Sequence, residues 1–161
     1  MKKHLYLLIA LILTAMTVLL TACGDDNDEL GFATQRYGSL TVTYKGSGTE
    51  HYYAHAAWWR YYPQKDETYF QVNLMEHSDD LIPEDFLGFS IKGSIGNSTT
   101  LKIEDIVMQS LTASLWDAHY YNQAGGQVTV KSLKGDIVTL EFKDVKFGNR
   151  TLNGEITYTK D

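Results

Sequence analysis

The sequence has 161 residues, one cysteine, two prolines and a formal net charge of −6, which together describe one acidic domain. An acidic chain offers no basic surface for phosphates, so we expect neither nucleic-acid binding nor charge-driven docking on anionic lipid. A lone cysteine also excludes an internal disulfide and any zinc or redox site built on paired cysteines.

Residues 1–22 have the layout of a secretory signal peptide. Lys2 and Lys3 precede an apolar run at 5–20, and small residues follow it. A membrane-spanning helix is the poorer interpretation, because the sixteen residues of this run reach only about 24 Å as a helix, against about 30 Å of hydrocarbon. No positively charged stop signal follows the run either.

The end of the apolar run determines the type of signal. It reads Leu20-Thr21-Ala22-Cys23, and Gly24 follows. This tetrapeptide resembles the lipobox of bacterial lipoproteins, in which the cysteine sulfur accepts diacylglycerol before cleavage and the freed amine takes a further acyl chain. The resemblance implies that Cys23 is the lipidation site, and three acyl chains anchor a protein almost permanently.

Residues 23–36 begin with an acidic cluster that is too polar to pack and is predicted to be a solvated tether. Lipoproteins of the Bacteroidetes carry a similar acidic stretch behind the lipidated cysteine, where it directs export to the outer leaflet. The resemblance implies a surface-exposed lipoprotein of the cell outer membrane. Because the glycine turn and distal glutamate of an EF-hand loop are missing, we expect no metal here. We expect no other cofactor either.

Without residues 1–22 the chain keeps 139 residues and, having lost Lys2 and Lys3, a net charge of −8. From residue 37 onward, apolar and polar residues alternate in short runs separated by Gly, Asn and Asp, as in antiparallel strands. The predicted strands are 39–45, 68–75, 86–91, 100–103, 126–132, 137–145 and 151–159. The pattern over residues 104–116 does not distinguish a helix from a strand. We predict an all-β domain over 37–161, an antiparallel β-sandwich of about seven to nine strands, with a small β-barrel as the alternative.

The clearest pair of strands is 126–132 with 137–145. Gly135 supplies the turn between them, because glycine adopts a positive φ without strain. The whole run 126–160 resembles the closing strands of small β-sandwich lipoproteins of gut Bacteroidetes. That resemblance implies a fold and no catalytic residue.

The most unusual segment is 51–62, HYYAHAAWWRYY, in which half of the residues are Tyr or Trp. Strict alternation would place Tyr53, His55, Ala57, Trp59 and Tyr61 on one face and Tyr52, Ala54, Ala56, Trp58, Arg60 and Tyr62 on the other. Both faces carry a Trp and a Tyr, and only one face meets the core. The other would expose aromatic rings suited to a sugar or a protein partner, unless cross-strand pairing or a covering loop buries them.

A second aromatic group lies at 116–122, just before Gly125 and Gly126. If the two groups meet in space, they form an aromatic platform, with polar side chains such as Asp117 and Asn122 available for hydroxyl groups. The candidate ligand-binding residues are Trp58, Trp59, Arg60, Tyr61, Trp116, His119 and Tyr120.

The chain shows no arrangement typical of an enzyme. His51 and His55 would lie about 13 Å apart on a strand, too far to share one zinc ion. A nucleophile elbow and a zinc-protease motif are missing, and the carboxylates are scattered. The sequence therefore predicts a non-catalytic lipoprotein that binds an extracellular ligand such as a glycan. The alternatives are a subunit that docks onto another envelope protein and, second, a small hydrolase.

Overall fold

The computed structural model describes residues 37–77, 82–96, 100–111 and 118–161, and all the elements in these ranges are strands. The predicted signal peptide, Cys23, the acidic tether and Trp116 lie outside the described residues. Across the described ranges, no helix has the length and apolar character needed to span a membrane. The strands are β1 (Gly38–Tyr44), β2 (Gly48–Tyr62), β3 (Glu67–Met75), β4 (Asp85–Lys92), β5 (Thr100–Leu101), β6 (Ile103–Ser110), β7 (Gly125–Lys134), β8 (Ile137–Phe147) and β9 (Arg150–Lys160).

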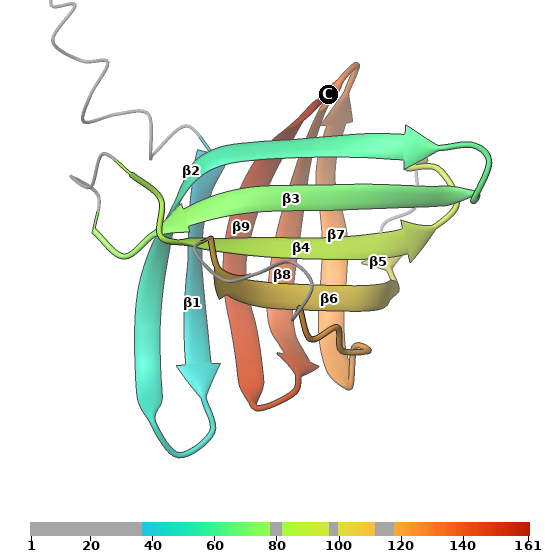
Figure 1. The fold of residues 1–161 in the computed structure, drawn as a ribbon. Coiled ribbons are helices and arrows are strands. Elements are labelled where there is room, and N and C mark those ends of the chain that lie inside the picture. The colour runs from blue at the N-terminus through green and yellow to red at the C-terminus, as the bar shows by residue number, and fades with distance from the viewer. Residues whose placement is uncertain (1–36, 78–81, 97–99, 112–117) are drawn as a thin grey trace, which may run out of the picture. The chain divides into compact units, whose positions relative to one another are not determined.

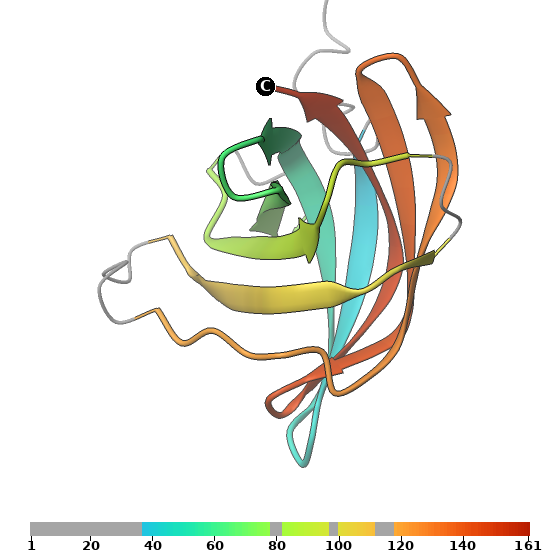
Figure 2. The same cartoon turned by 90° about the vertical axis from the view of Figure 1, so that its right-hand side faces the viewer.

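The strands form a single sheet in the order β5-β7-β8-β9-β1-β2-β3-β4-β6. In Figure 1, β2, β3, β4 and β6 cross in front of β1, β9, β8 and β7. The two end strands, β5 and β6, are separated in the chain only by Lys102. One run of chain therefore pairs with β7 through β5 and with β4 through β6, which brings the ends of the sheet together (Figure 2). The all-β prediction is confirmed, and the barrel alternative describes the sheet better than a sandwich of two sheets.

The long strand β2 changes partner along its length. Its first part pairs with β1 as far as Tyr53, and its second part pairs with β3, with a bulge between Ala54 and Ala56. Beyond β1, the main chain of β2 meets β9 directly, with Trp59 opposite Lys160 in a parallel pairing. This contact closes the seam that the shorter β1 leaves open.

The bulge in β2 decides which aromatic residues face the interior. Ala54 is buried before the bulge, and Ala57 and Trp59 are buried after it. An extra residue shifts the alternation by one, so the inward set changes from even to odd numbers. The strict alternation expected over 51–62 is therefore wrong, because Ala54 and Ala57 share one face.

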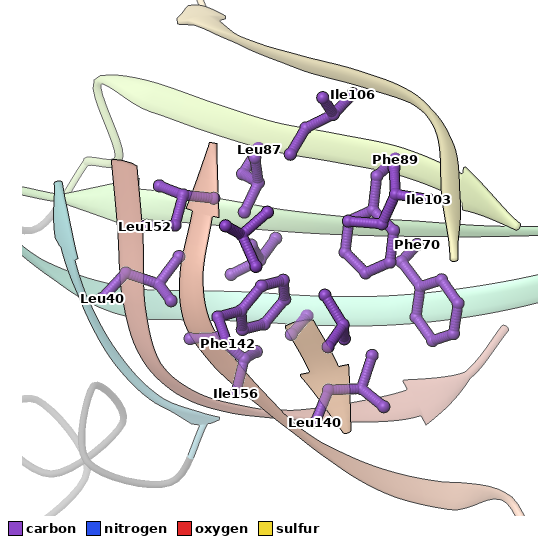
Figure 3. Close-up of a cluster of buried hydrophobic side chains, with 14 of the residues drawn as sticks. Leu40, Phe70, Leu87, Phe89, Ile103, Ile106, Leu140, Phe142, Leu152 and Ile156 are labelled. Atoms are coloured by element: carbon purple, nitrogen blue, oxygen red, sulfur yellow. The ribbon is translucent and has the colours of Figure 1, made fainter. Parts of the chain in front are cut away.

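Leucine, isoleucine and phenylalanine side chains fill the middle of the barrel (Figure 3). Phe70 and Phe89 stack with ring centroids 4.7 Å apart, and Tyr158 and Phe142 meet them edge-on. All four side chains are almost completely buried. A barrel of about eight strands is just wide enough for side chains to fill, so this interior serves as the core.

The expected hairpin is confirmed as β7 and β8, and Gly135 in its turn has a φ of +59°. The ambiguous segment 104–116 proves to be mainly the strand β6 over its described residues. Its isolated bridge between Ile106 and Tyr121 brings the chain after β6 back alongside that strand.

Candidate functional site

The outer face of β3, β4 and β6 carries a second layer of packed side chains. On β4, Leu87 and Phe89 point inward and join the core cluster. Phe86 is 5% exposed, and Val107 on β6 is 1% exposed, yet neither belongs to that cluster. A sheet face that meets only water would expose such residues. This outer face is thus partly covered.

Tyr69 lies at the centre of the outer face. A Cβ atom at Gly88 would collide with the Tyr69 hydroxyl, so glycine at this position leaves the space that the phenol occupies. Trp58 contacts the Tyr69 ring at 5.6 Å between centroids. Burial, helped by the nearby hydroxyls of Tyr120 and Tyr62, raises the pKa of Tyr69 to about 12. Tyr69 is therefore a neutral phenol that packs against the Trp58 ring.

Beside Tyr69 lies a hollow of about 540 Å³, which we call the large hollow. Tyr69, Ser90 and Asp105 are aligned across β3, β4 and β6 and form part of its wall. Its charged groups are the carboxylates of Glu67 and Asp105 and the ammonium group of Lys65. The residues that line the large hollow are Tyr62, Lys65, Glu67, Tyr69, Phe89, Ser90, Asp105 and Tyr120.

A second hollow, of about 330 Å³, adjoins the first and is called the small hollow. Tyr69 and Tyr120 line both hollows. The small hollow adds Phe86, Leu111 and Gln71, and none of its lining residues carries a charge. Gln71 accepts a long hydrogen bond from the Tyr69 hydroxyl at 3.5 Å and donates to Asn73 at 3.4 Å, so a row of polar groups follows β3.

Two of the predicted site residues belong to this face. Tyr120 is 57% exposed and lines both hollows. Trp58 lies outward on β2 and supports Tyr69 through their ring contact. These two positions come from the two aromatic segments of the sequence, and each lies beside Tyr69: Trp58 through a ring contact and Tyr120 in the walls of the hollows.

Trp59 and Tyr61 lie on the other side of β2. Trp59 is 8% exposed, and its indole nitrogen donates to the carbonyl oxygen of Asp136 at 3.1 Å. Tyr61 packs against the core, and its hydroxyl donates to Asp66 at 3.0 Å, a bond that raises the pKa of Tyr61. The structure therefore corrects the placement of Trp59 on an exposed platform, because the bulge in β2 turns that ring inward.

Two other predicted residues lie on the surface but line neither hollow. Arg60 is exposed and forms an ion pair with Asp161. His119 is exposed and meets the Tyr121 ring edge-on at 4.9 Å. The remaining candidate, Trp116, lies outside the described residues.

Sequence reasoning missed Tyr62, Tyr69, Glu67 and Asp105 as site residues. The alternation in β3 could have located Tyr69, since Phe70, Val72 and Leu74 occupy the inner face of their strand. That alternation leaves Tyr69 outward. What the sequence lacked was the register that places Tyr69 opposite Ser90 and near Trp58.

A different polar cluster surrounds the buried side chain of Tyr52 and includes exposed and partly buried groups. The Tyr52 hydroxyl donates to Glu50 at 2.6 Å and lies 3.2 Å from the Tyr44 hydroxyl. Asp85 also contacts Tyr52, and burial raises the pKa of Asp85. The guanidinium of Arg150 lies 5.4 Å from the centre of the Tyr44 ring. The Tyr52 hydroxyl thus has partners on β1 and β2, whereas Nε of Arg150 is buried without a hydrogen-bond partner among the described residues. We assign the cluster a structural role.

The described residues contain no group of three or more His, Cys, Asp or Glu side chains that could hold a metal ion. Comparisons with protein-family models, curated proteins and solved structures give no match. The geometry of the outer face is therefore the basis for a functional assignment.

Proposed function

We propose that this protein is a surface-exposed lipoprotein of the cell outer membrane whose barrel binds an extracellular glycan on the outer face of β3, β4 and β6. The observation that carries the proposal is the large hollow, which Tyr62, Tyr69 and Tyr120 line together with Glu67 and Asp105. Tyrosine rings stack on the apolar faces of sugar rings, and carboxylates accept hydrogen bonds from sugar hydroxyls. A concave site with this mixture of groups suits a saccharide.

The lipid anchor suits a weak binding site of this kind. Acyl chains on Cys23 would fix the barrel at the membrane, and the acidic tether of 23–36 would hold it away from the lipid. Many anchored copies that meet one repetitive polysaccharide bind it more tightly than one copy does. Weak binding by each single copy is then sufficient for tight binding of the polysaccharide by the whole surface.

We propose binding without catalysis. Two carboxylates, Glu67 and Asp105, line the large hollow, but Asp105 is exposed and Glu67 is half-buried. The general acid of a glycosidase is enclosed in a cleft with its partner carboxylate, and neither of these carboxylates is enclosed in that way. Incubation of the protein with the bound glycan should release no shorter products, as judged by chromatography. Product release that Glu67→Gln abolishes would support the hydrolase alternative.

A glycan array tests the binding site. Wild-type domain should label neutral glycans, and Tyr120→Ala should weaken that binding at least about tenfold, which corresponds to a ring contribution of about 1.4 kcal/mol or more. Ile137→Ala is the matched control, since Ile137 is 48% exposed and lines neither hollow. Equal binding by wild type and Tyr120→Ala would refute the site. Capture of an envelope protein in place of any glycan would favour the docking alternative.

The anchor has its own test. Cells expressing the wild-type protein should incorporate labelled palmitate into it, and Cys23→Ala should lose the label, because the acceptor sulfur is gone. A Thr21→Ser variant keeps a small residue before the cleavage site and serves as the control. Labelling that persists in Cys23→Ala would show that Cys23 is not the acceptor.

A further inference from the structure

The large and small hollows follow one another along the strands. The large hollow reaches Ser90 on β4, and the small hollow reaches Phe86 on the same strand. Four residues of extended chain span about 13 Å, which is longer than a single pyranose ring. Tyr69 and Tyr120 lie where the two hollows meet, since both residues line each of them.

We propose that the two hollows bind consecutive units of one uncharged oligosaccharide chain, with Tyr69 and Tyr120 at the junction. The inference rests on the proposed glycan binding and specifies its ligand. One sugar unit lies in the large hollow between Glu67 and Asp105, and the next lies in the small hollow against Phe86 and near the Gln71 amide. The site recognises an inner stretch of a chain and does not require a chain end.

The charges around the hollows select against acidic sugars. The large hollow has two carboxylates and one ammonium group, and the small hollow has no charged residue. A uronic acid or a sulfated sugar would bring its anion close to Glu67 or Asp105. Like charges at short range oppose binding, and the acidic chain as a whole adds to the repulsion. An uncharged sugar instead offers hydroxyl donors to the same carboxylates.

The spacing of the rings argues against a small cationic ligand. A cage for a quaternary ammonium group needs several rings within about 6 Å of one point. Among the described residues, the ring contact of Tyr69 is with Trp58, and neither Tyr62 nor Tyr120 meets Tyr69 ring to ring. Rings spread around a hollow of about 540 Å³ suit an extended ligand better.

The test is a series of calorimetric titrations with oligosaccharides of increasing length. The probes are malto-, xylo- and manno-oligosaccharides from monomer to hexamer, with oligogalacturonides of the same lengths as anionic counterparts. At least one neutral series should gain about tenfold or more in affinity between monomer and trimer, because the second unit reaches the second hollow. Oligogalacturonides should bind at least about tenfold more weakly.

A variant in the small hollow sharpens the test. Gln71→Ala should lower affinity for the trimer and hexamer while leaving the monomer unchanged, so the gain with length becomes smaller. Thr139→Ala on β8 is the control, since its hydroxyl lies 3.0 Å from that of Thr157 and the residue lines neither hollow. Circular dichroism and thermal melting verify that both variants fold.

The possible failures are distinguishable. A monomer that binds as tightly as the hexamer, tighter binding of oligogalacturonides, or tightest binding of choline as a cationic probe would overturn the two-hollow inference. A neutral array signal combined with any of these results would leave glycan binding intact. An array with no signal, together with silent titrations, would remove both the proposed function and the inference.

Discussion

The inner and outer faces of the wall formed by β2, β3, β4 and β6 are both rich in aromatic residues, but they differ in what closes them. Inside, Phe70 and Phe89 stack and are covered by Tyr158 from β9. Outside, Trp58 and Tyr69 pack together, and in the part of the chain that the structure describes they are not enclosed by a second wall of the sheet. The inner layer is completed by the fold, whereas the outer layer is left with two hollows. Aromatic content alone thus does not distinguish a core from a binding surface.

The adjacent residues Trp59 and Trp58 give the largest expected contrast between the faces. Trp59→Ala removes a buried ring and its hydrogen bond to Asp136, so we expect a loss of about 3–5 kcal/mol in the free energy of unfolding. Trp58→Ala should cost clearly less stability but weaken glycan binding, because Tyr69 loses its support. Urea unfolding and calorimetry of the two variants measure both effects. Similar losses of stability in both variants would mean that the outer layer is part of the hydrophobic core and is not a binding surface.

Gly88 tests whether the outer layer depends on close packing. In Gly88→Val the new Cβ collides with the Tyr69 hydroxyl, and we expect about 1–3 kcal/mol of destabilisation as Tyr69 moves aside. Glycan affinity should fall about tenfold in the same variant. Gly96→Val is the matched control, because no atom lies within 4 Å of a Cβ at Gly96. Unchanged affinity in Gly88→Val would show that the position of Tyr69 does not matter for binding.

Asp85, a polar exception on the inner face, gives the smallest expected effect. Burial raises the pKa of Asp85, so the folded chain holds this proton more tightly than the unfolded chain. The resulting stability is full below the ordinary carboxyl pKa and is lost as the pH rises through the raised value. Asp85→Asn should therefore show a flatter dependence of the unfolding free energy as the pH rises above about 4. A steeper dependence in the variant would reverse the sign assigned to this group.

The strands themselves were largely readable from the sequence. Alternation located the segments around Phe70, Phe89 and Phe142 on the correct faces, because one side of each strand meets the core. Residues 104–116 stayed ambiguous because β6 buries neighbours on both of its faces, as with Ile106 and Val107. A strand covered on both sides loses the period of two.

The site and the closure of the sheet were not readable in the same way. The bulge after Ala54 reverses the faces of Trp58 and Trp59, and nothing local in a run of alanines marks where a strand inserts an extra residue. The two hollows depend on the register of three strands, which brings Tyr69 beside Ser90 and Asp105. Register and closure are properties of pairing between distant segments, so they leave little trace within any one of them.

The pairing of β1 with β9 has a consequence for how the chain reaches its native state. Most other neighbours in the sheet lie much closer together in the chain, whereas Gly38 pairs with Ile156 and Trp59 pairs with Lys160. A chain that emerges from its N-terminus can form the meander strand by strand, but β1 must wait for the last strand before that edge is covered. During this interval β1 presents open hydrogen-bonding groups to any other strand. Completion of β9 is thus both the final step of assembly and the step that ends the risk of aggregation.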